Sequence, residues 1–177
     1  MFLQKELDAD IYPTFSEVSV ARTRKIWLLR HFSRVVSQMP LDFNFLTLRR
    51  RTAELAKAAA NEIDDASKGL LLFYAAECGL KAVYMSQNSL RWASETNGTA
   101  PKSAIDFQHR LDELIRELRI SPAALPHHPG VITLTNGERI SVQEVHQAWR
   151  YGGVIVETQQ VLVWLKLAIE YAKERMR

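Results

Sequence analysis

Residues 69–85, GLLLFYAAECGLKAVYM, decide the fold of this chain. Nearly every position in the stretch is apolar, so a helix built from it has no polar face to turn toward water. The stretch therefore predicts a central helix over about residues 65–86, with other helices packed around it. Glu77 and Lys81 are four residues apart in the favourable order for an ion pair on a helix. We expect them to pair with each other or with another helix, because isolated charges there would be costly.

Helical segments on both sides of this stretch complete a bundle. Residues 46–60 are rich in alanine and have high helix propensity. Residues 105–120 predict a shorter helix, and a final helix is expected from about Val154 to the C-terminus. The shorter helix has one apolar stripe for burial, formed by Leu111, Leu114, Ile115 and Leu118.

The segment between these last two helices has the pattern of a hairpin rather than of a helix. Asn136 and Gly137 are the strongest short-range signal for a hairpin, so a two-stranded ribbon is expected over about residues 131–140. Ser141 and Glu144 form a capping box, which predicts a short helix that begins at Ser141. The sequence therefore predicts an all-α, up-and-down helical bundle with a short hairpin inserted before the last helices.

Length and composition suit one soluble domain with an appendage. The chain has 177 residues, a net charge of +3 and one cysteine, Cys78, which suits a reducing compartment. Its start shows no secretory signal, and no stretch is apolar enough to span a membrane. We expect a cytoplasmic protein, with residues 1–46 as an N-terminal arm and basic amphipathic helix and residues 47–177 as the bundle.

Positive charge is concentrated near the N-terminus. Residues 22–51 carry eight basic side chains against one carboxylate, a net +7, which favours an acidic partner. In a helix over about residues 16–39, one face would present Arg24, Trp27, Arg30, His31 and Arg34. Basic groups around an aromatic ring are typical of single-stranded nucleic-acid binding. The alternative is that Trp27 packs against another subunit or the N-terminal arm while the arginines are solvated.

Three stretches in order resemble the HEPN domain family of small helical bundles. They are LLLFYAAECGLKAVYM at 70–85, HRLDELIREL at 109–118 and RYGG at 150–153. The resemblance covers roughly residues 47–177. It implies a homodimer with a groove between the copies, and a role in a prokaryotic defence or toxin–antitoxin unit beside a partner protein encoded nearby.

Many HEPN domains are metal-independent ribonucleases, and this implies a catalytic alternative. Their motif is an arginine followed after four to six residues by a histidine. Arg139 with His146 and Arg24 with His31 have this spacing. Arg150 is a further candidate catalytic arginine, since it precedes the last helix, but no histidine follows it at this spacing. A histidine can move the proton of a ribose hydroxyl, and an arginine can stabilise the charge that develops on the phosphate.

The stretch HQAWRYGG, residues 146–153, has two interpretations. In the structural one, Trp149 and Tyr151 pack while Arg150 reaches back toward Glu77, and the two glycines allow a close approach or a positive φ. In the binding one, Arg150 and His146 line a cleft at the hairpin.

The favoured function is a non-catalytic module that binds nucleic acid, a nucleotide or a partner protein. The alternative is a ribonuclease that uses Arg139 and His146. The sequence calls for no cofactor and no metal, because His127 and His128 lack the spaced partners of a zinc site and no glycine-rich phosphate loop is present.

Overall fold

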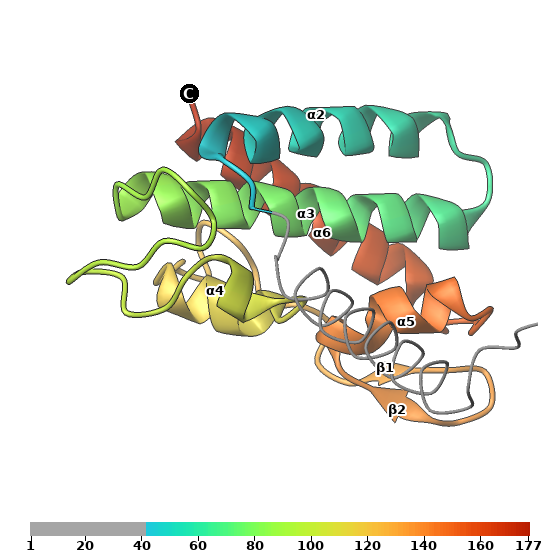
Figure 1. Ribbon diagram of the computed structural model, residues 1–177. Helices are drawn as coiled ribbons and strands as arrows, with labels where there is room; N and C mark the ends of the chain where they lie inside the picture. Colours follow the sequence, from blue (N-terminus) through green and yellow to red (C-terminus); the bar gives the residue numbers. More distant parts are fainter. Residues whose placement is uncertain (1–41) are drawn as a thin grey trace, which may run out of the picture. The chain divides into compact units, whose positions relative to one another are not determined.

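The computed structural model describes residues 42–177, which form a helical body with one small hairpin (Figure 1). The expected mainly helical fold with an inserted hairpin is confirmed for these residues. The helix expected over residues 16–39 lies outside the described residues.

Two antiparallel helices contain the stretch that decides the fold and the alanine-rich segment before it. Helix α2 covers Phe45–Asn61, and α3 covers Asp65–Gln87. The side chain of Asn44 accepts a hydrogen bond from the Thr47 N–H at 2.8 Å, and that of Asp64 accepts one from the Ser67 N–H at 2.7 Å. These caps satisfy donors that a helix leaves free in its first turn. Both helices match their predicted bounds closely.

Helix α3 is the central element, as its sequence predicts. Helices α2, α4, α5 and α6 all pack against it, and α2 and α6 cover neighbouring sides of it (Figure 1). Phe73, Ala75, Ala76, Leu80 and Met85 of α3 are completely buried. Because α3 has no polar face, its neighbours bury most of its surface.

The bundle begins before the predicted boundary at residue 46. Asp42 accepts hydrogen bonds from the backbone and the hydroxyl of Ser94, and the Phe43 carbonyl accepts from the Ala93 N–H. Asn44 forms an isolated β-bridge with Trp92. Residues 42–44 thus belong to the helical body, and a boundary at 46 would fall inside α2.

The helix expected over residues 105–120 is two shorter elements. A single 3₁₀ turn, η1, covers Ile105–Phe107, and α4 covers Leu111–Glu117. Gln108 between them has a φ of 47°, in the left-handed region, which ends the first turn. The predicted stripe is still buried at Leu111, Leu114 and Leu118.

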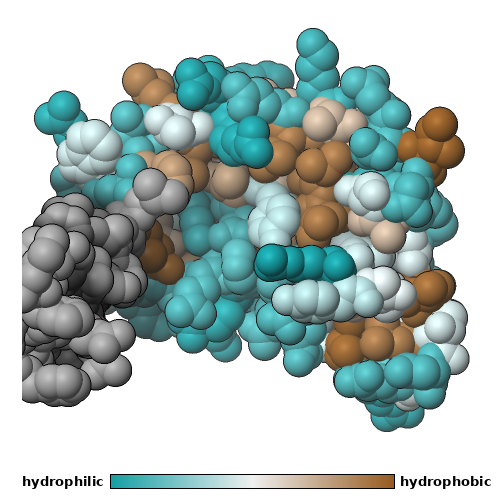
Figure 2. All heavy atoms as spheres, turned by 45° about the vertical axis from the view of Figure 1, so that its right-hand side comes forward, coloured by the Kyte–Doolittle hydropathy of each residue, from teal (hydrophilic) through white to brown (hydrophobic). Residues whose placement is uncertain are grey.

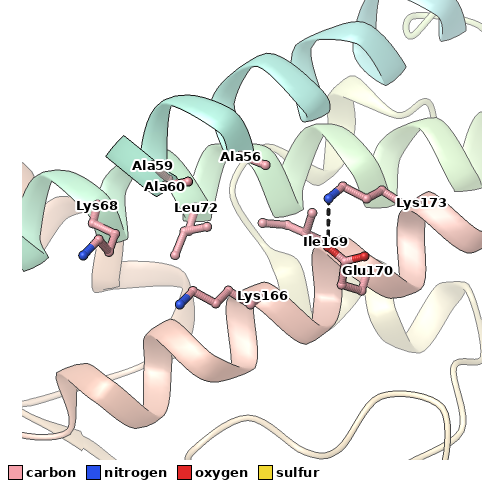
Figure 3. A pocket seen from close by; sticks show the side chains of 9 residues that line it. All are labelled: Ala56, Ala59, Ala60, Lys68, Leu72, Lys166, Ile169, Glu170 and Lys173. Atoms are coloured by element: carbon pink, nitrogen blue, oxygen red, sulfur yellow. Dashed lines mark hydrogen bonds and ion pairs between the residues drawn. The ribbon is translucent and has the colours of Figure 1, made fainter. Parts of the chain in front are cut away.

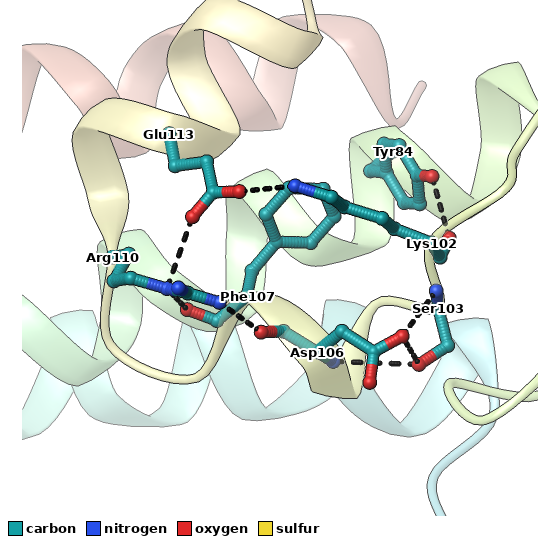
Figure 4. A network of polar contacts seen from close by, with 7 residues as sticks. All are labelled: Tyr84, Lys102, Ser103, Asp106, Phe107, Arg110 and Glu113. Atoms are coloured by element: carbon teal, nitrogen blue, oxygen red, sulfur yellow. Dashed lines mark hydrogen bonds and ion pairs between the residues drawn. The ribbon is translucent and has the colours of Figure 1, made fainter.

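Polar contacts fix the loop that leads to α4 (Figure 4). Asp106 accepts hydrogen bonds from the backbone and the hydroxyl of Ser103. Glu113 pairs with both Lys102 and Arg110, and the Tyr84 hydroxyl donates to the Lys102 carbonyl at 2.7 Å. Phe107 lies completely buried among these groups. Two of these contacts, Lys102 with Glu113 and Tyr84 with Lys102, join residues 11 and 18 positions apart, so no local pattern in the sequence predicts them.

The hairpin is present and gains an unexpected third segment. Strands β1 (Ile132–Thr133) and β2 (Arg139–Ile140) pair antiparallel, with Gly137 in the turn at a φ of 86°. Residues 154–156 add to the other side of β1, where the Val156 N–H donates to the Thr133 carbonyl at 2.8 Å and the Thr135 N–H donates to the Val154 carbonyl at 2.9 Å.

The prediction that the last helix starts at Val154 is therefore wrong. Helix α6 covers Thr158–Arg175, and before it Ile155 forms an isolated β-bridge with Leu134 while Val156 and Glu157 lie in a turn. Three consecutive β-branched residues at 154–156 favour a strand over a helix, and β1 offers them hydrogen bonds. The carboxylate of Glu157 also accepts from the Thr133 N–H at 2.8 Å, which fixes the start of α6 beside the hairpin.

The predicted capping box is confirmed at Ser141. The Glu144 carboxylate accepts from the Ser141 N–H at 2.8 Å and from its hydroxyl at 2.6 Å. A 3₁₀ turn, η2 (Val142–Glu144), follows and continues as α5 (Val145–Arg150). This turn directs His146 and Trp149 toward α3, because both are buried on the side that packs there.

The surface is mixed in character. On the face shown in Figure 2, apolar residues lie in separate groups between polar ones. Near the hairpin, the exposed apolar side chains are Val131, Tyr151, Val154 and Val156. Within residues 42–177, every helix is too short or too polar to cross a membrane.

Candidate functional site

Five side chains from three parts of the chain meet at the middle of α3. We call them the histidine cluster: Phe73, Glu77, Lys81, His109 and His146. Glu77 is buried, and one of its carboxylate oxygens accepts a hydrogen bond from Lys81 Nζ at 2.6 Å. Its other oxygen lies 2.9 Å from Nδ1 of His109. The predicted pairing of Glu77 with Lys81 is confirmed, and His109 is a second partner that the sequence did not indicate.

His109 is the accessible member of the cluster. It follows Gln108, whose left-handed backbone turns the chain between η1 and α4. Its side chain is 47% exposed. In the neutral form of His109, an acceptor at Glu77 places the proton on Nδ1 and leaves the lone pair of Nε2 free. A carboxylate that orients an imidazole in this way prepares the second nitrogen to accept a proton or a hydrogen bond.

His146 is the buried member. Its residue is only 5% exposed, and its ring stacks on Phe73 with 4.8 Å between the ring centroids. The rings of His146 and His109 are 4.4 Å apart. Nδ1 of His146 is buried and makes no hydrogen bond that meets normal geometry.

Burial lowers the pKa of His146, and the neighbouring His109 ring and the Arg150 guanidinium lower it further. The Gln143 backbone and the Glu77 carboxylate oppose this shift. The direction follows because a protonated imidazole would lose its hydration and add charge to a cluster where Glu77 is already paired with Lys81. His146 is therefore a neutral, packed side chain near pH 7.

The candidate catalytic arginines, Arg139 and Arg150, are not members of the histidine cluster. Arg139 is exposed on β2, opposite Thr133. Among the described residues, no hydrogen bond or ring contact joins Arg139 to His146, and one side chain faces solvent while the other is buried. A phosphate held by Arg139 would therefore meet the hairpin rather than an exposed imidazole.

The structural interpretation of HQAWRYGG needs a correction at two residues. Trp149 packs as expected, but Tyr151 is 78% exposed. Arg150 is also exposed, with its guanidinium 5.6 Å from the centre of the Tyr151 ring, and does not reach Glu77. The reason is that Lys81 and His109 already occupy both oxygens of that carboxylate.

Glycines shape the contact of α5 with α3. A Cβ at Gly69 would lie 2.5 Å from the Trp149 ring, so only glycine lets the indole pack this closely on α3. Gly152 has a φ of 81°, which confirms the expected positive φ where α5 ends. A Cβ at Gly153 would lie 3.0 Å from the Ala148 carbonyl. The glycines therefore serve packing and chain reversal.

Cys78 lies one residue beyond Glu77 and is half-buried. Burial raises the pKa of its thiol to about 11, and the Glu77 charge acts in the same direction. A thiol that stays protonated at neutral pH is a poor nucleophile. The structure therefore gives Cys78 no part in the chemistry of the cluster.

The sequence alone predicts no role for His109, although the stretch that contains it resembles a HEPN motif. The signal available was its position in HRLDELIREL, next to a stripe of buried leucines. The predicted nucleic-acid residues Arg24, Trp27, Arg30, His31 and Arg34 lie outside the described residues. Within residues 42–177, no group of three His, Cys, Asp or Glu side chains is placed to hold a metal ion.

Comparison with known proteins identifies no relative of this chain. No family model, no curated protein and no solved structure matches it. The chemistry of the site is therefore inferred from its own side chains.

Proposed function

We propose that this chain is a HEPN-like, non-catalytic binding module. It acts as a cytoplasmic homodimer that binds nucleic acid, with a nucleotide or a partner protein as the alternative ligand, in a prokaryotic defence or toxin–antitoxin unit. The observation that carries the proposal is the burial of His146, which has the spacing from Arg139 that the ribonuclease motif requires. A buried, neutral imidazole that Arg139 does not contact is unsuited to proton transfer on RNA.

Support for the HEPN-like assignment comes from the contacts of its motifs. Glu77 and Lys81 come from the first resembling stretch and His109 from the second, and the three side chains meet in one cluster. The contact of Glu77 with His109 gives a physical reason for the order and spacing of the two stretches.

Support for an acidic ligand comes from the charge of α2 and the chain before it. The net +7 of residues 22–51 includes Arg49, Arg50 and Arg51, all of which are exposed on α2. Arg50 and Arg51 both pair with Glu54, so this run keeps a net positive charge. Exposed arginines of this kind attract phosphate groups through screened, salt-sensitive interactions.

The test is the binding of a fluorescent single-stranded RNA at two salt concentrations. The Arg24, Trp27 and Arg34 triple alanine variant should weaken binding by about tenfold or more, because it removes one stacking ring and two phosphate contacts. A double glutamine variant of Lys57 and Arg116 removes two other exposed positive charges and is the control for the loss of charge. Equal affinity of the wild type and the first variant would refute the proposal.

One observation favours a second function, a metal-independent ribonuclease. His109, unlike His146, is exposed and oriented by a carboxylate. In that case His109 would accept the proton of a ribose hydroxyl through Nε2. RNA incubated with the protein in EDTA distinguishes the two functions. The binding module predicts no cleavage, whereas a ribonuclease of this type predicts cleavage that His109→Gln abolishes and that exposed His127→Gln leaves unchanged.

A further inference from the structure

Helices α2 and α6 both pack on α3, and their separation changes along it. At Gly79 the three helices are close, since a Cβ there would lie 2.8 Å from Ala172 Cβ and 3.2 Å from Thr52 Cγ2. Toward the start of α3 the space between α2 and α6 opens. The residues that α2 offers there are Ala56, Ala59 and Ala60, which are too small to fill it.

The result is a cavity of about 340 Å³, which we call the lysine cavity (Figure 3). Its apolar lining consists of the three alanines of α2 with Leu72 and Ile169. Its charged lining consists of Lys68 from α3 and Lys166, Glu170 and Lys173 from α6. The volume is within the range of pockets that hold small organic ligands.

The lysines around the lysine cavity differ in how closely they pair with a carboxylate. Glu170 accepts a hydrogen bond from Lys173 at 2.8 Å, and Lys68 lies 3.9 Å from Asp65. Lys166 is exposed and has no carboxylate partner among the described residues. One ammonium group is thus free, and Lys68 has only a long ion pair that an anion could replace.

We propose that the lysine cavity binds a small organic anion, in which a phosphate or carboxylate group is joined to a compact apolar body. The ammonium groups of Lys166 and Lys68 hold the anionic group, and the alanines with Leu72 and Ile169 contact the apolar body. The proposal goes beyond the function above, because the cavity is lined by α2, α3 and α6 and includes no member of the histidine cluster.

The probe is 8-anilinonaphthalene-1-sulfonate, an anionic apolar dye, titrated by fluorescence into the full chain. We expect saturable binding at one site. Lys166→Gln and Lys68→Gln should each weaken it by about two- to fivefold, the effect of losing one solvent-screened ion pair. The control Lys57→Gln removes a positive charge from α2 outside the cavity and should leave the affinity unchanged.

Two filling variants test the apolar half of the site. Ala56→Leu places a larger side chain in the lining and should abolish dye binding. Ala60→Leu should also abolish it, and because Ala60 is more exposed than Ala56, this second substitution should disturb the fold less. Near-UV circular dichroism confirms that each variant keeps its native packing. Dye binding that survives both substitutions, or that falls equally in Lys57→Gln, would overturn the proposal.

Competition separates the two possible anionic groups. Phenyl phosphate and octanoate each join an anion to an apolar body, and the one that displaces the dye at lower concentration identifies the preferred group. Inorganic phosphate and 1-octanol each lack one half of the proposed ligand and should displace it poorly. Displacement by 1-octanol as strong as that by octanoate would show that the lysines play no part and would refute the proposal.

Discussion

At the scale of single residues, two imidazoles that contact the same phenyl ring have opposite environments. His109 is exposed and held by a carboxylate, whereas His146 is buried and its Nδ1 has no partner. The difference in exposure arises from the position of each histidine in the fold. His109 comes from a turn at the surface, and His146 comes from the side of α5 that faces α3. Burial and the contact with Glu77 together distinguish the candidate base, His109, from the packing residue, His146.

The lowered pKa of His146 predicts a loss of stability in mild acid. Below about pH 6.5 the unfolded chain binds a proton at this residue that the folded chain resists, so the free energy of unfolding decreases as the pH falls. His146→Phe keeps a ring against Phe73 and removes the titration. Urea unfolding between pH 5 and 8 should show a shallower pH dependence for this variant than for the wild type.

The control substitution is His128→Asn, at a histidine that lies outside the cluster. It should change the slope of unfolding free energy against pH less than His146→Phe does. If His146→Phe and the wild type have the same slope, the imidazole is not buried in solution as described.

A second prediction concerns the thiol of Cys78. With its pKa raised to about 11, roughly one thiol in a thousand is ionised at pH 8, far fewer than for a free cysteine. Alkylation by iodoacetamide at pH 8 should therefore be slower by about a hundredfold than that of glutathione under the same conditions. Mass spectrometry over time measures the rate, and fast alkylation in the folded protein would contradict the described burial.

At the scale of elements, one contact decides how α5 lies on α3. The Trp149 ring covers Gly69, where any side chain would overlap it. Gly69→Ala should destabilise the fold by about 1–3 kcal/mol, because the cost of overpacking a rigid ring exceeds the helix propensity that alanine gains. Thermal unfolding measures the change.

A double variant shows whether this contact is the cause. In a Trp149→Leu background the smaller side chain leaves room for a methyl group, so Gly69→Ala should then cost much less. Costs that are equal in the two backgrounds would mean that the glycine matters for some reason other than the indole.

At the scale of the whole molecule, residues 42–177 contain a continuous core. Buried side chains of all five α-helices and the hairpin belong to one cluster. A fragment of residues 42–177 should therefore unfold in a single cooperative transition, as small domains with one core do. Circular dichroism at 222 nm and in the near-UV during heating measures this, and a fragment without near-UV signal would contradict it.

The sequence alone determined those elements that depend only on neighbouring residues. The apolar run at 69–85, the alanine-rich helix before it, the Asn136–Gly137 turn and the capping box at Ser141 act over a few neighbouring residues, and each is present in the structure. The ion pair of Glu77 and Lys81 is equally local, since one helical turn brings the two together.

Only the tertiary structure decided the contacts between distant residues. The third segment beside β1, the break at Gln108, the hydrogen bond from His109 to Glu77, the burial of His146 and the exposure of Tyr151 all depend on which element packs beside which. Spacing along the chain placed Arg139 and His146 in one motif, yet the hairpin presents the first to solvent and α5 turns the second into the core. The physical reason is that burial is a property of the packed neighbours, and a local pattern does not contain them.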